Sequence, residues 1–77
     1  MSWNYRVVKK ADRLGNYFEI HEVYYDDNGN PNGWTEDAIK PYGVDLDDLR
    51  WVLEHMVTAL DKPVLEIVDE KLVEVKL

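Results

Sequence analysis

Cysteine is absent from the 77 residues of this chain. The chain therefore has no disulfide framework and no thiolate metal ligands. A lack of disulfides is typical of cytoplasmic proteins, so we expect a cytoplasmic location. No apolar run approaches the roughly 20 residues of a membrane-spanning helix, and no signal-peptide pattern precedes the first predicted strand. We accordingly expect no membrane partner.

Basic residues are scarce, with 9 lysines and arginines against 16 acidic residues and a formal net charge of −7. Nucleic-acid binding usually requires a basic surface, because its affinity comes largely from neutralising phosphates. Arg6, Lys9, Lys10 and Arg13 do cluster near the N-terminus, but a solvated strand end explains them better. We predict that nucleic acid is not a partner.

Common catalytic and cofactor-binding motifs are also missing. The sequence has no P-loop, no glycine-rich dinucleotide loop, no nucleophile elbow and no zinc-protease helix. Its two histidines, His21 and His55, belong to different predicted elements. The turn that starts at Asp26 has part of the spacing of a calcium loop, but Pro31 replaces the necessary glycine, and a hairpin turn is the better interpretation. We predict no enzymatic activity, no cofactor and no metal site.

One long segment, residues 45–60, has clean helical periodicity. Asp45 is a good N-cap, Asp48 is placed to complete a capping box, and Pro63 ends the helix. An amphipathic helix cannot bury its apolar side alone, so we expect a sheet to cover it. The apolar residues that share this side, called the apolar stripe below, are Leu46, Leu49, Leu53, Met56, Val57 and Leu60.

Strand patterns precede the helix. Residues 3–10 alternate between apolar and polar, residues 17–25 are rich in aromatic and β-branched side chains, and together they predict an antiparallel hairpin. The asparagine- and glycine-rich segment 26–33 predicts a turn, followed by a short third strand at 34–40.

Two further strands are predicted after the helix, at 64–68 and 72–77, with a tight turn between them. A helix from about 65 to 75 is the alternative, which the β-branched residues of this segment disfavour.

This order, β-β-β-α-β-(β), predicts a single α+β domain over residues 1–77. We expect a mainly antiparallel sheet of three to five strands with the amphipathic helix packed on one face. The sheet residues predicted to face the apolar stripe are Trp3, Tyr5, Val7, Phe18 and Ile20.

The second predicted strand changes its pattern half-way, because its apolar residues are even-numbered at first and odd-numbered later. A β-bulge near His21 and Glu22 would explain the change and keep Glu22 in solvent. Two alternatives remain: Glu22 pairs with Arg6 or a lysine across the ladder, or it lies in a pocket with a shifted pKa. The pocket alternative predicts a ligand site at His21, Glu22 and Tyr24.

Trp51 and His55 project from the helix on the side opposite its apolar stripe, and Asp48 borders them. A tryptophan on the solvent side of a small domain is typical of a contact surface. We therefore predict an interaction surface at Trp51, His55 and Asp48. The alternative is that the C-terminal segment folds back over Trp51.

The run YFEIHEVYYDDNG, followed by WTE, PYG, DLDDLRWVLEHM and ALDKPVLE, resembles a group of short bacterial proteins, cyanobacterial ones among them. They share an F-x-IHEVYYD strand followed by glycine, a P-x-G-x-x-L-x-x-L helix entry and an AL-x-KPVL helix exit. The resemblance extends to Glu66 and implies no particular chemistry. The element order and the helix entry at residues 43–49 also resemble the HicB-type antitoxin fold, which implies three strands, a helix and a fourth strand, but no DNA-binding extension follows here.

We predict from these observations a small acidic, non-catalytic protein–protein interaction module. Its partner is another protein or a second copy of the chain, because a symmetric dimer covers exposed surfaces most simply. One alternative is a small-ligand-binding or enzymatic domain that uses His21 and Glu22, and another is a HicB-like regulator.

Overall fold

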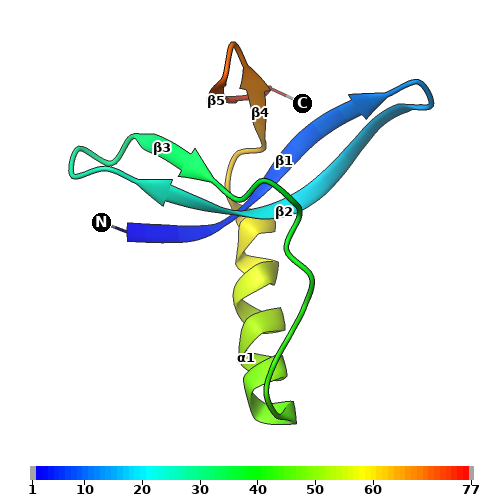
Figure 1. Ribbon diagram of the computed structural model, residues 1–77, viewed down its shortest axis with the longest axis vertical. Helices are drawn as coiled ribbons and strands as arrows, with labels where there is room; N and C mark the ends of the chain where they lie inside the picture. The colour runs from blue at the N-terminus through cyan, green and yellow to red at the C-terminus, as the bar shows by residue number, and fades with distance from the viewer. Residues whose placement is uncertain (1, 77) are drawn as a thin grey trace.

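The computed structural model describes residues 2–76 (Figure 1). Its five strands form one sheet with the order β3-β2-β1-β4-β5. In chain order the elements are β1 (Ser2–Asp12), β2 (Gly15–Tyr25), β3 (Pro31–Trp34), α1 (Leu46–Val57), the 3₁₀ helix η1 (Thr58–Asp61), β4 (Leu65–Val68) and β5 (Lys71–Glu74).

The α+β class is confirmed, and the sheet is mixed, because one of its four strand pairs is parallel. Strand β4 runs parallel to β1, with Val8 opposite Leu65, while the other three strand pairs are antiparallel. Parallel strands need a long crossover connection, and here the segment that contains α1 and η1 provides it. The order of strands and helices also differs from the expected one, because η1 separates α1 from β4.

The third strand lies at Pro31–Trp34, so the prediction of a strand at 34–40 is wrong. Proline is tolerated there because β3 is an edge strand. Beyond it, Thr35 and Ile39 still donate single backbone hydrogen bonds to β2, but Glu36 and Asp37 have poor strand propensity and the ladder does not continue.

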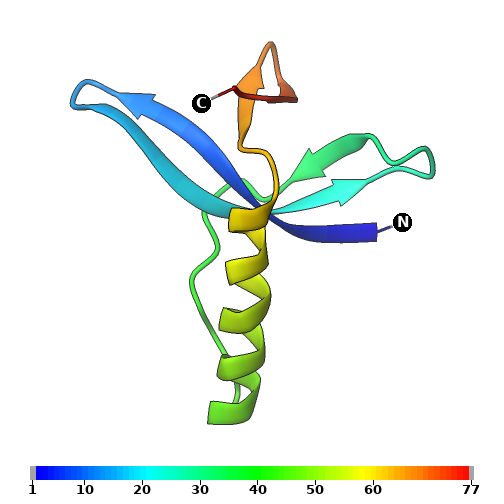
Figure 2. The same ribbon diagram turned by 180° about the vertical axis from the view of Figure 1, so that it is seen from behind.

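Each face of the sheet carries a small core. On one face Tyr5 and Val7 pack with Met56 and Ala59 of the helical segment. The β4–β5 hairpin lies on the other side of the sheet from the helix (Figures 1 and 2), and β5 contacts β3 there. The core on that side consists of Val23, Leu65 and Leu72, with Tyr25 and Trp34 packed against it.

Two covered faces explain the pattern change in the second strand. The β1–β2 register is continuous past His21 and Glu22, so the predicted β-bulge is wrong. The one register shift of β2 lies between Tyr24 and Tyr25, where it pairs with β3. Apolar residues occur at both even and odd positions of β2 because each face of the strand contacts a core.

The helix projects from the sheet instead of lying across it (Figures 1 and 2). Its predicted cap is present: the Asp45 carboxylate accepts a hydrogen bond from the Asp48 backbone N–H at 2.8 Å. The Asp48 carboxylate in turn accepts from the Val44 N–H at 3.0 Å, one residue before the cap. In the part of the chain that the structure describes, no helix has the length and apolar character needed to cross a membrane.

The predicted strand–turn–strand at the C-terminus is confirmed by β4 and β5, although the second strand spans Lys71–Glu74 rather than 72–77, of which residue 77 lies outside the described residues. The two turn residues, Asp69 and Glu70, both have positive φ, at 52° and 64°. Two consecutive positive φ angles define a type I′ turn, which favours Asn-Gly because other side chains are strained there.

We expect the double substitution Asp69→Asn, Glu70→Gly to raise the free energy of unfolding by about 1 kcal/mol, because it relieves this strain. Urea denaturation would measure the change. The matched control is Glu74→Gly in β5, which should lower stability because glycine weakens a strand. A loss of stability in both variants would contradict the turn assignment.

Candidate interaction surface

Only the last part of the helical segment contacts the sheet. Across α1 and η1, the buried residues are Met56 and Ala59. Val52, half-buried, packs against the same core. At about 100° per residue, the side of the helix that these residues share lies roughly 100° around the axis from Leu53, at the centre of the apolar stripe.

The apolar stripe is therefore largely exposed, and the prediction that the sheet covers it is wrong. Leu46 keeps 82% of its surface exposed, Leu53 44% and Leu60 71%. Of the stripe, Met56 alone is buried. Sheet residues predicted to face the stripe divide in the same way, because Tyr5 and Val7 reach the core whereas Phe18 stays half-exposed.

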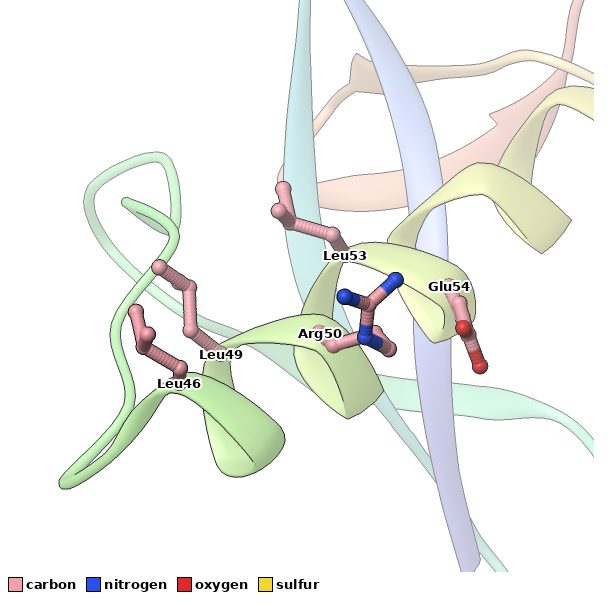
Figure 3. Close-up of a pocket in the computed structure, with 5 residues that line it drawn as sticks. All are labelled: Leu46, Leu49, Arg50, Leu53 and Glu54. Atoms are coloured by element: carbon pink, nitrogen blue, oxygen red, sulfur yellow. The ribbon is translucent and has the colours of Figure 1, made fainter.

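A shallow groove follows the first half of the stripe, with a volume of about 400 Å³. Figure 3 shows Leu46, Leu49 and Leu53 projecting from one side of α1, with Arg50 and Glu54 beside them. An aliphatic groove with charged residues at its border has the composition of a protein-contact site.

A second apolar cleft lies where the stripe ends against the sheet. It has a volume of about 320 Å³ and contains Leu60, with Phe18 from β2 and Val7 from β1. Its lining is completed by Ala59, Lys62 and Val64. The stripe and this cleft are called the leucine face below.

The linker between β3 and α1 fixes the start of the helix. Gly43 packs so closely on the first turn that a Cβ atom there would clash with the backbone of Leu49. Ile39 anchors the middle of the linker in the core. The linker nevertheless leaves Tyr42 and Val44, which precede Leu46 in the chain, largely exposed.

Trp51 and His55 stack on each other, with ring centroids 3.7 Å apart and an interplanar angle of 25°. They line a hollow of about 290 Å³ together with Trp3 and Tyr5 of β1. The segment that adjoins Trp51 is thus the N-terminal strand, not the C-terminal segment considered above. Trp51 remains 48% exposed, and the interaction surface at Trp51, His55 and Asp48 stays a prediction.

Asp48 belongs to the helix cap, as its hydrogen bonds to residues 44 and 45 show. Its side chain is therefore held by the backbone before any partner arrives. Sequence reasoning located the aromatic pair but missed the exposure of the leucine face, because periodicity identifies an apolar side without saying what covers it.

The three residues of the predicted ligand site do not converge. His21 lies on the side of β2 that faces the second core and is fully buried. Glu22 and Tyr24 lie on the opposite face, where the Tyr24 hydroxyl donates a hydrogen bond to the Glu22 carboxylate at 3.2 Å. Burial and the neighbouring Glu22 raise the pKa of Tyr24. Access to His21 and to Glu22 would have to come from different sides of the sheet.

The N-terminal basic residues are dispersed by the alternation of β1. Arg6 points inward, where its guanidinium donates to the Tyr25 hydroxyl at 3.0 Å and to the Pro63 carbonyl at 2.6 Å. Lys9 pairs with Glu66 of β4 at 3.8 Å, and Lys10 pairs with Glu19 of β2 at 3.2 Å. The four cations therefore do not form one patch.

Within residues 2–76, no group of three or more histidine and carboxylate side chains is placed to hold a metal ion. Comparison of the chain with known protein families, with curated proteins and with solved structures found no match. The two resemblances drawn from the sequence stay predictions.

His21 gives the second core an acid-sensitive point. Its Nδ1 lies 2.9 Å from the Thr35 carbonyl oxygen, to which it donates in the neutral ring, while Nε2 is buried without a partner. Burial lowers the pKa of His21 below its ordinary value, and the hydrogen bond to Thr35 opposes this effect only in part. The folded state therefore favours the uncharged ring.

We expect the free energy of unfolding to fall as the pH drops through about 6.5, where His21 of the unfolded chain takes up a proton that the folded chain resists. This decrease in the free energy of unfolding is complete once the pH is below the lowered pKa that His21 has in the folded chain. Urea titrations at pH 7.5 and 5.5 would measure it. His21→Leu should lower stability at pH 7.5 by about 1–3 kcal/mol and flatten the pH dependence, since it removes both the hydrogen bond and the titration.

The matched control is His55→Gln, which changes the exposed histidine. We expect it to keep the difference in the free energy of unfolding between pH 7.5 and pH 5.5. The assignment of the pH dependence to His21 would be contradicted if this difference in the free energy of unfolding disappeared in His55→Gln but persisted in His21→Leu.

Proposed function

We propose that this chain is a small acidic protein-interaction module that binds its partner through the leucine face. The observation that carries the proposal is the exposure of a regular leucine stripe on a helix that projects from the sheet. Leu46 and Leu53 of α1 and Leu60 of η1 recur every seven residues, which is the spacing of a helix seam that packs against another apolar surface.

The length of the helix supports the proposal. Isolated helices shorter than about 12–15 residues are marginal in water, and α1 has 12 residues. Its last turn is held by Met56 and its first turn by the cap at Asp45. Covering the exposed side between these two points would stabilise the helix by removing apolar surface from water.

Recognition in this form is the helix-in-groove mode, in which anchors at i, i+3, i+4 and i+7 enter an apolar surface. Arg50 and Glu54 at the border supply charge that orients the partner. The net charge of −7 favours faster association with a basic partner at low salt, and it slows association between two copies of this chain. A site of this kind needs no catalytic group, which agrees with the non-catalytic function inferred from the sequence.

The aromatic pair Trp51 and His55 is a second, smaller part of this proposal. The pair lies on the far side of the helix from Leu53, so one flat partner cannot cover both surfaces. A small-ligand site at His21 and Glu22 has weaker support, because the two side chains lie on opposite faces of β2.

The test is to replace Leu53 with a photoreactive phenylalanine analogue and irradiate the full chain in the cells that produce it. We expect a covalent adduct with a protein at this position, because the partner covers the leucine face. The matched control places the same analogue at Asn28, an exposed turn residue between β2 and β3, and should give none.

Mass spectrometry of the adduct identifies the partner as this chain or another protein. The proposal fails if position 53 yields no protein adduct, or if position 28 yields the same adducts as position 53.

A further inference from the structure

We propose that the leucine face pairs with the leucine face of a second copy of this chain, with the two helices antiparallel and Leu53 on the two-fold axis. This inference rests on the proposed function and names its partner. Four observations carry it: the excess of exposed surface, the symmetry of the leucine spacing, the fit between the ends of the helix, and the distribution of charge.

The chain exposes more surface than a folded monomer of its size. Its accessible surface is 5928 Å², whereas a compact monomer of 9.1 kDa is expected to expose about 4,900 Å². The Cα radius of gyration is 13.1 Å, against about 11.5 Å expected for 77 residues. This excess of about 1,000 Å² belongs to the whole chain, including the projecting β1–β2 hairpin as well as the helix (Figures 1 and 2). It is large enough to include the roughly 800 Å² that each partner buries in a standard interface.

The stripe is self-complementary when it is reversed. With Leu53 opposite its own copy, Leu46 of one helix lies opposite Leu60 of the other, and Leu49 lies opposite Val57. Every one of these pairs is apolar. The Leu53 pair lies on the axis and occurs once, whereas each of the other two pairs occurs twice, as a two-fold interface requires. A symmetric partner therefore covers all the exposed residues of the stripe in this one register, while Met56 stays in the core.

The ends of the leucine face also match in this registration. Tyr42, Val44 and Leu46 protrude at the start of the helix, each more than two-thirds exposed. The cleft that contains Phe18 and Leu60 lies at the opposite end. Antiparallel pairing brings the protruding end of each copy to the cleft of the other, so exposed side chains outside the helix are covered as well.

Charge favours the antiparallel direction over the parallel one. Asp45, Asp47 and Asp48 gather at the start of α1, and parallel helices would place two such clusters side by side. Antiparallel helices separate the clusters and bring each one near Lys62, which lines the cleft of the other copy. Asp61 beside that lysine weakens the attraction, so the apolar pairs supply the affinity and the charges select the direction.

The absence of cysteine makes a clean crosslinking test available. In the otherwise native chain, Leu53→Cys should form a disulfide between copies under mild oxidation, because the two residues meet at the axis. Leu46→Cys is the matched control. In the antiparallel dimer its two copies lie about 21 Å apart along the helices, beyond the roughly 7 Å Cα separation that a disulfide allows.

Adding Leu60→Cys to Leu46→Cys should restore the crosslink, because these positions face each other. Equal crosslinking of Cys variants at 46 and 53 would overturn the antiparallel arrangement.

Light scattering over a range of concentrations gives the second readout. The native chain should have about twice its 9.1 kDa mass, and Leu53→Glu should be a monomer. Val68→Glu in β4 is the matched control, since Val68 is 43% exposed against 44% for Leu53 and lies away from the helix. That variant should stay dimeric.

A native chain that is monomeric at every concentration and gives no crosslink at position 53 overturns the dimer. The proposed function is judged separately by the photoreactive analogue: an adduct with a different protein would support it while the dimer fails. If Leu53→Glu loses its helical circular dichroism, the disulfide pattern in the cysteine variants decides, because those substitutions preserve an apolar residue.

Discussion

A single contact joins the helix to the sheet, and the shape of the molecule depends on it. Met56 and Ala59 pack on Tyr5 and Val7, close to the point where the chain turns into β4. Because the contact lies at one end of the helical segment, the remaining turns of α1 are held by the cap and by the linker. The leucine face is the surface that this arrangement leaves open.

The second core has a different chemistry from the first. It places Arg6 and His21, which are paired across β1 and β2, under the β4–β5 hairpin. Arg6 is held by a hydroxyl and a carbonyl, and in the described part of the chain no carboxylate lies within ion-pair distance of it. Buried charge without a counter-charge costs stability, so this core relies on its hydrogen bonds and on Val23, Leu65 and Leu72.

Much of the local structure could be predicted because it depends on neighbouring residues. The cap at Asp45 follows from a carboxylate placed three residues before a free N–H, and the C-terminal hairpin follows from β-branched residues on either side of a polar pair. The third strand was misplaced because propensity is a weak guide at a sheet edge, where backbone pairing with β2 decides which residues are held. The prediction of a bulge near His21 is wrong because it requires one face of β2 to point into water, whereas both faces of this strand contact a core.

Local patterns along the chain are enough to establish the fold class, the hairpins and the presence of one amphipathic helix, since periods of two and 3.6 residues are local properties. They also locate the apolar stripe around Leu53. Packing between distant elements establishes that β4 pairs in parallel with β1 and that His21 rather than Glu22 is buried. It also turns the centre of the stripe by about 100° from the side of the helix that packs on the sheet. The exposure of the stripe depends on how the helical segment is rotated about its contacts at Val52, Met56 and Ala59, and a rotation between elements distant in the chain has no signature in local sequence.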